Sequence, residues 1–126
     1  MNITGIDIHT YYVKDANRAI AFYRDTLGLN CTWEYEGMGA EFELPDGSTF
    51  GLWKPDGEMQ WEPGHGIMFA VPDIEAAVTE LRNKGVDISD AEEQPPCFMA
   101  FAKDTEGNNF IVHQRKAGAG QDTVLQ

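Results

Sequence analysis

Three histidines and two cysteines are the side chains of this sequence that could ligate a transition metal or take part in covalent chemistry: His9, His65, His113, Cys31 and Cys97. The cysteines form neither a Cys-x-x-Cys pair nor another metal-ligand spacing, and we interpret both as reduced thiols. The sequence has no Ser-His-Asp pattern and no glycine-rich phosphate loop. His113 could act as a general base, because imidazole titrates near neutral pH. We favour a role as a hydrogen-bonding or ligand contact, since a lone histidine near a strand end more often has one.

Carboxylates and tryptophans form a second group of candidates. Four glutamates alternate along two neighbouring segments: Glu34, Glu36, Glu41 and Glu43. This alternation favours a solvated sheet face, and the alternative is an acidic rim that attracts a cationic ligand. Trp33 and Trp61, with Met59 nearby, could form an aromatic wall or lid, where an amine or flat ring would gain roughly 0.5 to 2 kcal/mol per cation–π contact. They could equally fill a dimer interface.

Composition narrows the classes of partner. The chain has 126 residues, 9 of them basic and 21 acidic, and a formal charge of −12. Bulk electrostatics therefore disfavour nucleic acid and an anionic membrane, whereas a cationic ligand would be attracted. No segment has the pattern of a secretory signal, and no run of 18 consecutive residues is apolar. We expect a soluble, cytoplasmic protein with one compact domain.

The first half of the chain predicts the elements that would position these residues. β-Branched and aromatic residues predict a strand from Ile3 to Val13. Asp15 is a suitable N-cap for a helix from Ala16 to Leu27, and Gly28 is placed to end it. Three short strands separated by glycine-containing turns follow, over Cys31–Glu36, Ala40–Leu44 and Thr49–Lys54.

The same order of predicted strands and helix occurs a second time in the sequence. Residues 46–53 match residues 106–113 position by position, with an offset of 107−47 = 60 at the turn glycines and 73−15 = 58 at the helix-capping aspartates. The second copy predicts a helix from Ile74 to near Gly85. Its strands are expected at Gly66–Val71, Asp87–Glu93, Cys97–Ala102 and Phe110–Gln114. Residues 55–64 have the composition of a linker, and residues 117–126 that of a flexible tail.

Several motifs in this order resemble the vicinal oxygen chelate superfamily, which includes glyoxalase I, extradiol dioxygenases, fosfomycin-resistance enzymes and bleomycin-resistance proteins. They are the Asp-capped helix with Ala-x-x-Phe-Tyr at 19–23, Leu-Gly-Leu at 27–29 and the Glu-Gly-Asn turn at 106–108. The resemblance covers about Ile3 to Gln114. It implies an α+β fold in which two βαβββ units, 3–54 and 65–114, form a cupped mixed sheet within a single domain, 1–116.

In metal-dependent relatives, each half supplies two ligands to one ion, seven residues before the capping aspartate and four after the turn glycine. Counting here (15−7, 47+4, 73−7, 107+4) gives residues that cannot ligate: Ile8, Gly51, Gly66 and Ile111. His9 and His65 lie six and eight residues before their aspartates, so one common bulge cannot rescue both, and each has the wrong parity. We therefore expect no metal, no cofactor and no catalytic residue, as in the metal-free bleomycin-resistance proteins, whose cavity binds a ligand.

Alternation along each strand gives the residues that share a sheet face with these four positions, at which relatives carry metal ligands. With the two tryptophans at the mouth, we expect the ligand-binding residues to be Thr10, Tyr12, Trp33, Thr49, Trp53, Trp61, Met68, Asn109 and His113. Trp53 and His113 occupy equivalent places in the two repeats and are expected to face each other. This composition is typical of a small-molecule pocket, and a closed hydrophobic core is the alternative.

We expect a metal-independent small-molecule binding protein, of which a sequestering resistance protein is one form, with a small aromatic or cationic ligand. Two alternatives stay open: a metal-dependent lyase, isomerase or dioxygenase of the same superfamily with an atypical site, and a structural or interaction module with a filled cup. Whether the protein is an enzyme is left undecided, although the residue types argue against it. A homodimer is expected, because two cupped half-sheets leave edges and apolar faces that need covering.

Overall fold

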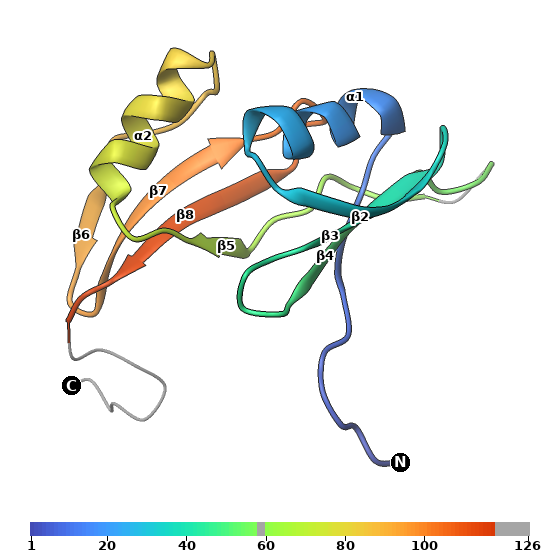
Figure 1. Cartoon of the computed structure of the whole chain (residues 1–126), viewed down its shortest axis with the longest axis horizontal. Coiled ribbons are helices and arrows are strands. Elements are labelled where there is room, and N and C mark those ends of the chain that lie inside the picture. Colours follow the sequence, from blue (N-terminus) through green and yellow to red (C-terminus); the bar gives the residue numbers. More distant parts are fainter. Residues whose placement is uncertain (58–59, 118–126) are drawn as a thin grey trace. The chain divides into compact units, whose positions relative to one another are not determined.

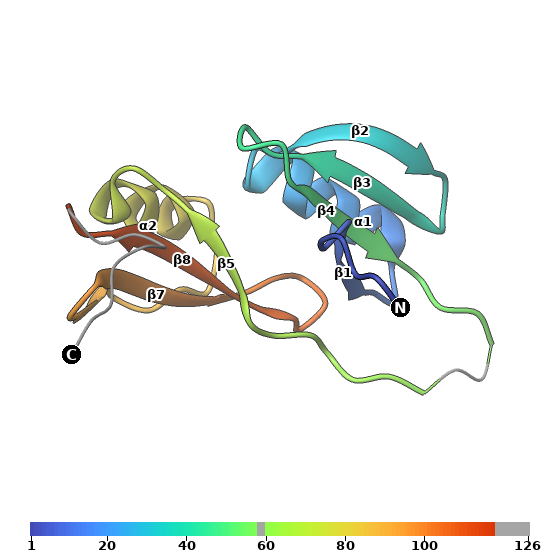
Figure 2. The same ribbon diagram turned by 90° about the horizontal axis from the view of Figure 1, so that it is seen from below.

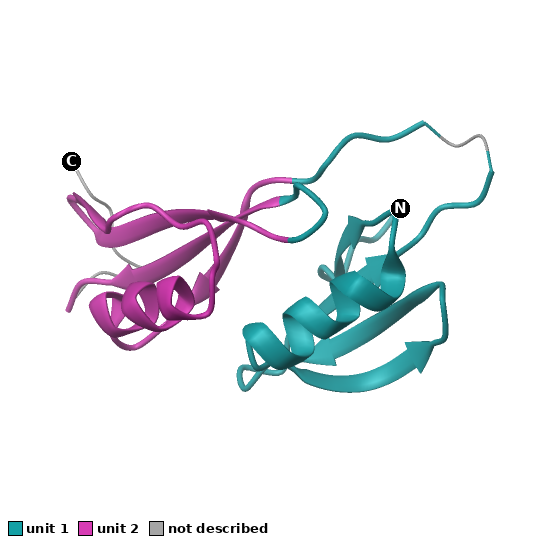
Figure 3. Ribbon diagram, turned by 90° about the horizontal axis from the view of Figure 1, so that it is seen from above, with its two compact units in different colours: residues 1–64, 105–108 teal, residues 65–104, 109–126 magenta. Residues whose placement is uncertain are grey.

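The computed structural model describes residues 1–57 and 60–117. The chain forms two compact units, shown in Figure 3: unit 1 contains Met1–Gly64 and Thr105–Asn108, and unit 2 contains His65–Asp104 and Asn109–Gln126. Met59 and the tail predicted beyond residue 117 lie outside the described residues. Within the described ranges, no helix is long and apolar enough to cross a membrane.

Unit 1 is a βαβββ unit (Figure 1). Its elements are β1 (His9–Tyr12), α1 (Ala16–Ala21), the π-helical segment η1 (Phe22–Thr26), β2 (Asn30–Tyr35), β3 (Gly39–Glu43) and β4 (Thr49–Trp53). The strand order is β1-β4-β3-β2, with β1 parallel to β4 and the other pairs antiparallel. The predicted helix is interrupted, because Leu27 N donates to Phe22 O and widens its second half. The predicted first strand is shorter, since only His9–Tyr12 pairs with β4.

Unit 2 repeats this order, and its sheet is seen from another side in Figure 2. It contains β5 (Ile67–Ala70), α2 (Ile74–Asn83), β6 (Glu92–Gln94), β7 (Cys97–Lys103) and β8 (Asn109–Arg115), in the order β5-β8-β7-β6. His9 pairs with Phe50 and Ile67 with Phe110, so the offsets of 58 (67−9) and 60 (110−50) are confirmed. The predicted α+β class with two βαβββ units is therefore confirmed.

The strand predicted at Asp87–Glu93 is the clearest difference within unit 2. Only Glu92 and Glu93 of that range lie in β6, and Ile88 makes an isolated bridge to Ala102. Residues 87–89 still bond to β7, because the Ser89 N–H donates to the Phe101 carbonyl at 2.9 Å and the Lys103 N–H donates to the Asp87 carbonyl at 3.2 Å. Pairing stops after Ser89, where the exposed Asp90 side chain forms an ion pair with Arg82 at 2.7 Å.

Each helix packs on one face of its own sheet. In unit 1, the fully buried Tyr23 ring lies 4.8 Å from Phe50 and 6.3 Å from Phe42, measured between ring centroids. In unit 2, the buried residues Val78 and Leu81 of α2 belong to the same core as Phe110 and Val112 of β8. Burying one such side chain contributes roughly 1.5 to 3 kcal/mol. The opposite face of each sheet is left uncovered by its helix.

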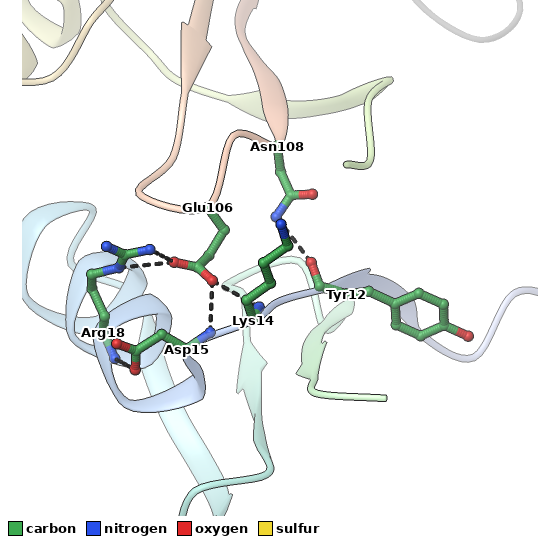
Figure 4. Close-up of polar contacts among 6 residues, drawn as sticks. All are labelled: Tyr12, Lys14, Asp15, Arg18, Glu106 and Asn108. Atoms are coloured by element: carbon green, nitrogen blue, oxygen red, sulfur yellow. Dashed lines mark hydrogen bonds and ion pairs between the residues drawn. The ribbon is translucent and has the colours of Figure 1, made fainter. Parts of the chain in front are cut away.

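The turn Thr105–Asn108 belongs to unit 1, where Glu106 binds the start of α1 (Figure 4). Glu106 Oε1 accepts hydrogen bonds from the backbone N–H groups of Lys14 and Asp15, both at 2.7 Å. Its Oε2 accepts from Arg18 Nε at 2.8 Å and forms an ion pair with Arg18 Nη2. The carboxylate side chain is only 1% exposed. Burial alone would raise the pKa of Glu106, but the Asp15 amide, the Arg18 guanidinium and the Lys14 amide together lower it. We call these four residues the Glu106 clasp.

The second repeat lacks two of the donors that a matching clasp would need. At an offset of 58, the lysine and arginine of the clasp correspond to Pro72 (72−14) and Ala76 (76−18). Proline has no backbone N–H, and alanine has no guanidinium. In the turn equivalent to residues 106–108, Asp46 Oδ1 instead accepts from the N–H and hydroxyl of Ser48, at 3.0 and 2.6 Å. The clasp is a property of the first helix.

The Glu106 clasp predicts a pH-dependent contribution to stability. We expect Glu106→Gln to lower the free energy of unfolding by about 1 to 3 kcal/mol near neutral pH, because two backbone N–H groups and the Arg18 guanidinium lose a charged acceptor. The folded-state pKa lies below the ordinary value of 4.5, so the stabilisation is complete above that pH and is lost as the pH falls through the folded value. Urea denaturation at about pH 7 and about pH 3 measures it.

The matched control is Asp46→Asn in the equivalent turn, whose aspartate is exposed and bonds within its own turn. This control should change stability little. A difference between wild type and Glu106→Gln that stays constant from neutral to acid pH would contradict the assignment of the clasp.

Candidate functional site

Aromatic side chains gather on the uncovered face of the unit 1 sheet. Trp33 lies 6.3 Å from Tyr35, and Tyr35 lies 6.3 Å from Trp53, with the rings of each pair nearly perpendicular. Tyr12, the ladder partner of Trp53, lies 6.2 Å from Trp61. Trp33 is 45% and Tyr35 is 56% exposed. We call these five residues the aromatic face.

A β-bulge turns Trp33 onto this face. Cys31 pairs with Phe42, which is fully buried beneath α1, whereas Trp33 pairs with Glu41. Between these two pairs, β2 therefore contains one more residue than β3. This extra residue reverses the alternation of side chains along β2 from that point on. Without the bulge, the indole of Trp33 would lie on the helix-covered side of the sheet.

Gly39 allows Trp53 to lie close over β3. A Cβ atom at Gly39 would lie 2.7 Å from Trp53 Cε3 and 2.3 Å from the Leu52 carbonyl oxygen. Both distances are too short for non-bonded atoms, so any larger residue would displace the indole or the strand. The absence of a side chain at residue 39 therefore sets the position of Trp53.

Two carboxylates share the aromatic face. Glu41 is half-buried and lies opposite Trp33, while Glu43 is exposed farther along β3 on the same side. Glu34 lies opposite Ala40, a residue of the helix-covered side, and reaches Arg24 at 3.8 Å. The four alternating glutamates therefore do not form one solvated face, because the bulge separates Glu34 from the carboxylates of β3.

The uncovered face of the unit 2 sheet has a different chemistry. Its exposed apolar side chains are Met68 (52%) and Phe101 (44%). His113 is half-buried and pairs with Met99 on β7 and with Ala70 on β5. This face is rich in thioether and aliphatic groups. Its imidazole, that of His113, lies on β8, the strand between β5 and β7.

The four positions that hold metal ligands in relatives carry no ligating side chain in this fold. A Cβ atom at Gly51 would meet Ile8 Cγ2 at 3.1 Å and Thr10 Oγ1 at 3.2 Å, which confirms that these residues share one face. Met68 pairs with Ile111 at the equivalent place in unit 2. Aliphatic groups and glycine cannot replace histidine and carboxylate ligands, so a divalent ion does not fit this donor set. Among residues 1–57 and 60–117, no three His, Cys, Asp or Glu side chains are grouped as metal ligands.

The predicted site residues divide between the two units. Unit 1 brings six of them to its uncovered face or edge: Thr10, Tyr12, Trp33, Thr49, Trp53 and Trp61. Unit 2 carries Met68, Asn109 and His113 on its own uncovered face. The expectation that Trp53 and His113 face each other stays a prediction.

Tyr35 was not among the predicted site residues, and Glu41 was predicted only as part of an alternative acidic rim. Tyr35 could have been found from Trp33, because residues two apart on a strand share a face. The position of Glu41 opposite Trp33 could not be predicted, since it depends on the bulge in β2. His9 lies opposite Phe50 at the first paired position of β1 and is exposed, whereas Tyr11 farther along the strand is buried.

Solved structures with a similar fold include proteins of different described roles. TnmS3, an antibiotic binding protein from Streptomyces sp. CB03234, has a TM-score of 0.80 and 20% identity, covering 92% of this chain and 99% of that one. A lactoylglutathione lyase from Agrobacterium tumefaciens has a TM-score of 0.76 and 20% identity, covering 90% and 96%. A superfamily member from Sphaerobacter thermophilus DSM 20745 has a TM-score of 0.76 and 23% identity, covering 90% and 98%. These likenesses establish the fold.

A search among curated proteins gave no match. The family model described as the Glyoxalase/Bleomycin resistance protein/Dioxygenase superfamily matches residues 5–112, which include every strand and helix except the last three residues of β8. The resemblance inferred from the sequence motifs is confirmed, and this chain belongs to the Glyoxalase/Bleomycin resistance protein/Dioxygenase superfamily.

Proposed function

We propose that the protein is a metal-independent small-molecule binding protein and that the ligand lies on the aromatic face of unit 1. The exposure of Trp33 and Tyr35 carries this proposal. A sheet face that only met solvent would be expected to carry polar side chains, and exposed aromatic clusters are typical of interaction sites. The edge-on ring contacts hold the side chains in fixed orientations, so little conformational entropy is lost when a flat ligand binds.

The charges on this face favour a cationic aromatic ligand. Glu41 is half-buried next to Trp33, where a carboxylate acts through a lower effective dielectric than in bulk water. A positive charge would meet this carboxylate and the π-electrons of the indoles together. The formal charge of −12 would add long-range attraction that salt weakens.

The similarity to TnmS3 supports the same class of function. TnmS3 is an antibiotic binding protein, and its fold matches this one over nearly the whole of both chains. Sequestration of a toxic aromatic compound is the role that we propose. It needs a binding surface and no reacting group, which matches a site without ligating side chains at the four expected positions.

A thermal-shift comparison of three flat compounds of matched size tests the proposal. Proflavine is cationic, acridine is neutral near pH 7, and anthracene-2-sulfonate is anionic. We expect proflavine to stabilise the protein most and the sulfonate least, and a ligand at 100 times its dissociation constant adds about 2.7 kcal/mol. Trp53→Ala should weaken proflavine by about 1 to 3 kcal/mol, because a large contact surface is removed.

Two glutamates provide a charge-matched pair of variants for the same experiment. Glu41→Gln should weaken proflavine and leave acridine unchanged, whereas Glu34→Gln, on the opposite side of the sheet, should affect neither. Preferred binding of the sulfonate, or proflavine binding that resists both Trp53→Ala and Glu41→Gln, would refute the proposed site. His113→Ala reports whether the bound molecule also reaches unit 2.

The uncovered apolar surface also supports the proposal that the protein is a homodimer. Ile3 and Ile6 are exposed, as are Met68 and Phe101 of unit 2, and β1 and β5 are edge strands. Exposed apolar groups and open sheet edges favour association.

Sedimentation velocity at micromolar concentration should give a dimer. Phe101→Glu should favour the monomer and Thr79→Glu, on the exposed side of α2, should not. A monomeric wild type would remove this proposal.

A further inference from the structure

Asn108 is a fully buried polar residue that joins two separate segments of unit 1. Its Oδ1 accepts a hydrogen bond from the backbone N–H of Gly64 at 2.6 Å, and its Nδ2 donates to the backbone carbonyl of Tyr12 at 3.2 Å. Figure 4 shows the amide reaching the Tyr12 carbonyl from the turn that also carries Glu106. The end of β1 and the end of residues 60–64 are thus fixed to one side chain.

These two segments carry the aromatic pair at one end of the aromatic face. The Trp61 ring lies 6.2 Å from the Tyr12 ring, at an interplanar angle of 76°. Three residues later, a Cβ atom at Gly64 would lie 2.6 Å from Tyr11 Cδ1, so residue 64 must be glycine to lie this close to the core. The Lys14 ammonium lies 6.0 Å from the Trp61 ring centroid. Trp61 is therefore held near β1 by a backbone anchor and by ring contacts.

We infer that Asn108 is a positioning residue of the aromatic face, which holds Trp61 against Tyr12. This role rests on the proposed function insofar as it affects ligand affinity. Asn108 is fully buried and bonds to the backbone of Gly64 and Tyr12, so it acts through these two segments. The equivalent residue of the first repeat is Ser48 (108−60), whose hydroxyl instead donates to Asp46 within its own turn.

Fluorine NMR with 5-fluorotryptophan tests the positioning role without a ligand. The protein has three tryptophans, so each resonance can be assigned by single replacement. In Asn108→Ala we expect the Trp61 resonance to move toward that of a solvent-exposed indole, while those of Trp33 and Trp53 keep their positions. Ser48→Ala is the matched control and should move none. An unmoved Trp61 resonance, or equal movement of all three, would overturn the inference.

Binding of proflavine tests the effect on affinity. Asn108→Ala should raise the dissociation constant by the same factor as Trp61→Ala, about 2- to 30-fold for the loss of one cation–π contact. In the Trp61→Ala background, Asn108→Ala should have no further effect. Full additivity would overturn the inference. If wild type bound no proflavine, the proposed function would fail, and the fluorine spectra would still decide the positioning role.

Asn108→Asp keeps the test decisive if Asn108→Ala does not fold. The introduced carboxyl can accept from Gly64 N–H at any pH, but it can donate to the Tyr12 carbonyl only when protonated. The Trp61 resonance should therefore be displaced at about pH 7 and return toward its wild-type position at about pH 4, with wild type measured at both pH values. A resonance that keeps its wild-type position throughout, or that moves together with those of Trp33 and Trp53, would overturn the inference.

Discussion

The packing of one helix on one face of each sheet is the constraint on which the rest of this structure depends. In unit 1, Tyr23 lies against Phe42 and Phe50 and fixes which strand positions face the helix. Because side chains alternate along a strand, the same contact fixes which positions face away. The aromatic face is the set of residues left on that second side, and its orientation follows from the burial of the first.

The two repeats keep this backbone plan and differ in the side chains that they present. Trp53 corresponds to His113, and Tyr12 corresponds to Ala70. Unit 1 thus carries the large rings and the half-buried carboxylate, together with the Glu106 clasp and the Asn108 anchor. Unit 2 carries methionines and a histidine on its uncovered face and lacks the donors for a second clasp. This divergence supports ligand recognition by unit 1, with a separate role for the apolar surface of unit 2.

Much of this arrangement could be predicted from the sequence. The offsets of 58 and 60, the two aspartate caps and the glycine turns gave the element order, because they depend on local conformation and periodicity. The faces of β1, β4, β5 and β8 followed from alternation. The face of Trp33 did not, since one inserted residue in β2 reverses the alternation and has no marker in the sequence. The hydrogen bonds from Asn108 to Gly64 and Tyr12 could not be predicted either, because these partners lie 44 and 96 residues away in the chain.

Binding of a flat cation to the aromatic face of unit 1 is the function that we propose. Titration of ¹⁵N-labelled protein with proflavine tests it most directly, because the indole N–H signals of Trp33 and Trp53 and the amides of β3 and β4 report on that face residue by residue. We expect saturable shifts at both indoles and at Glu41 and Gly51, with little change along the outer sides of α1 and α2. Saturable shifts confined to the helices, with both indole signals unmoved, would contradict it.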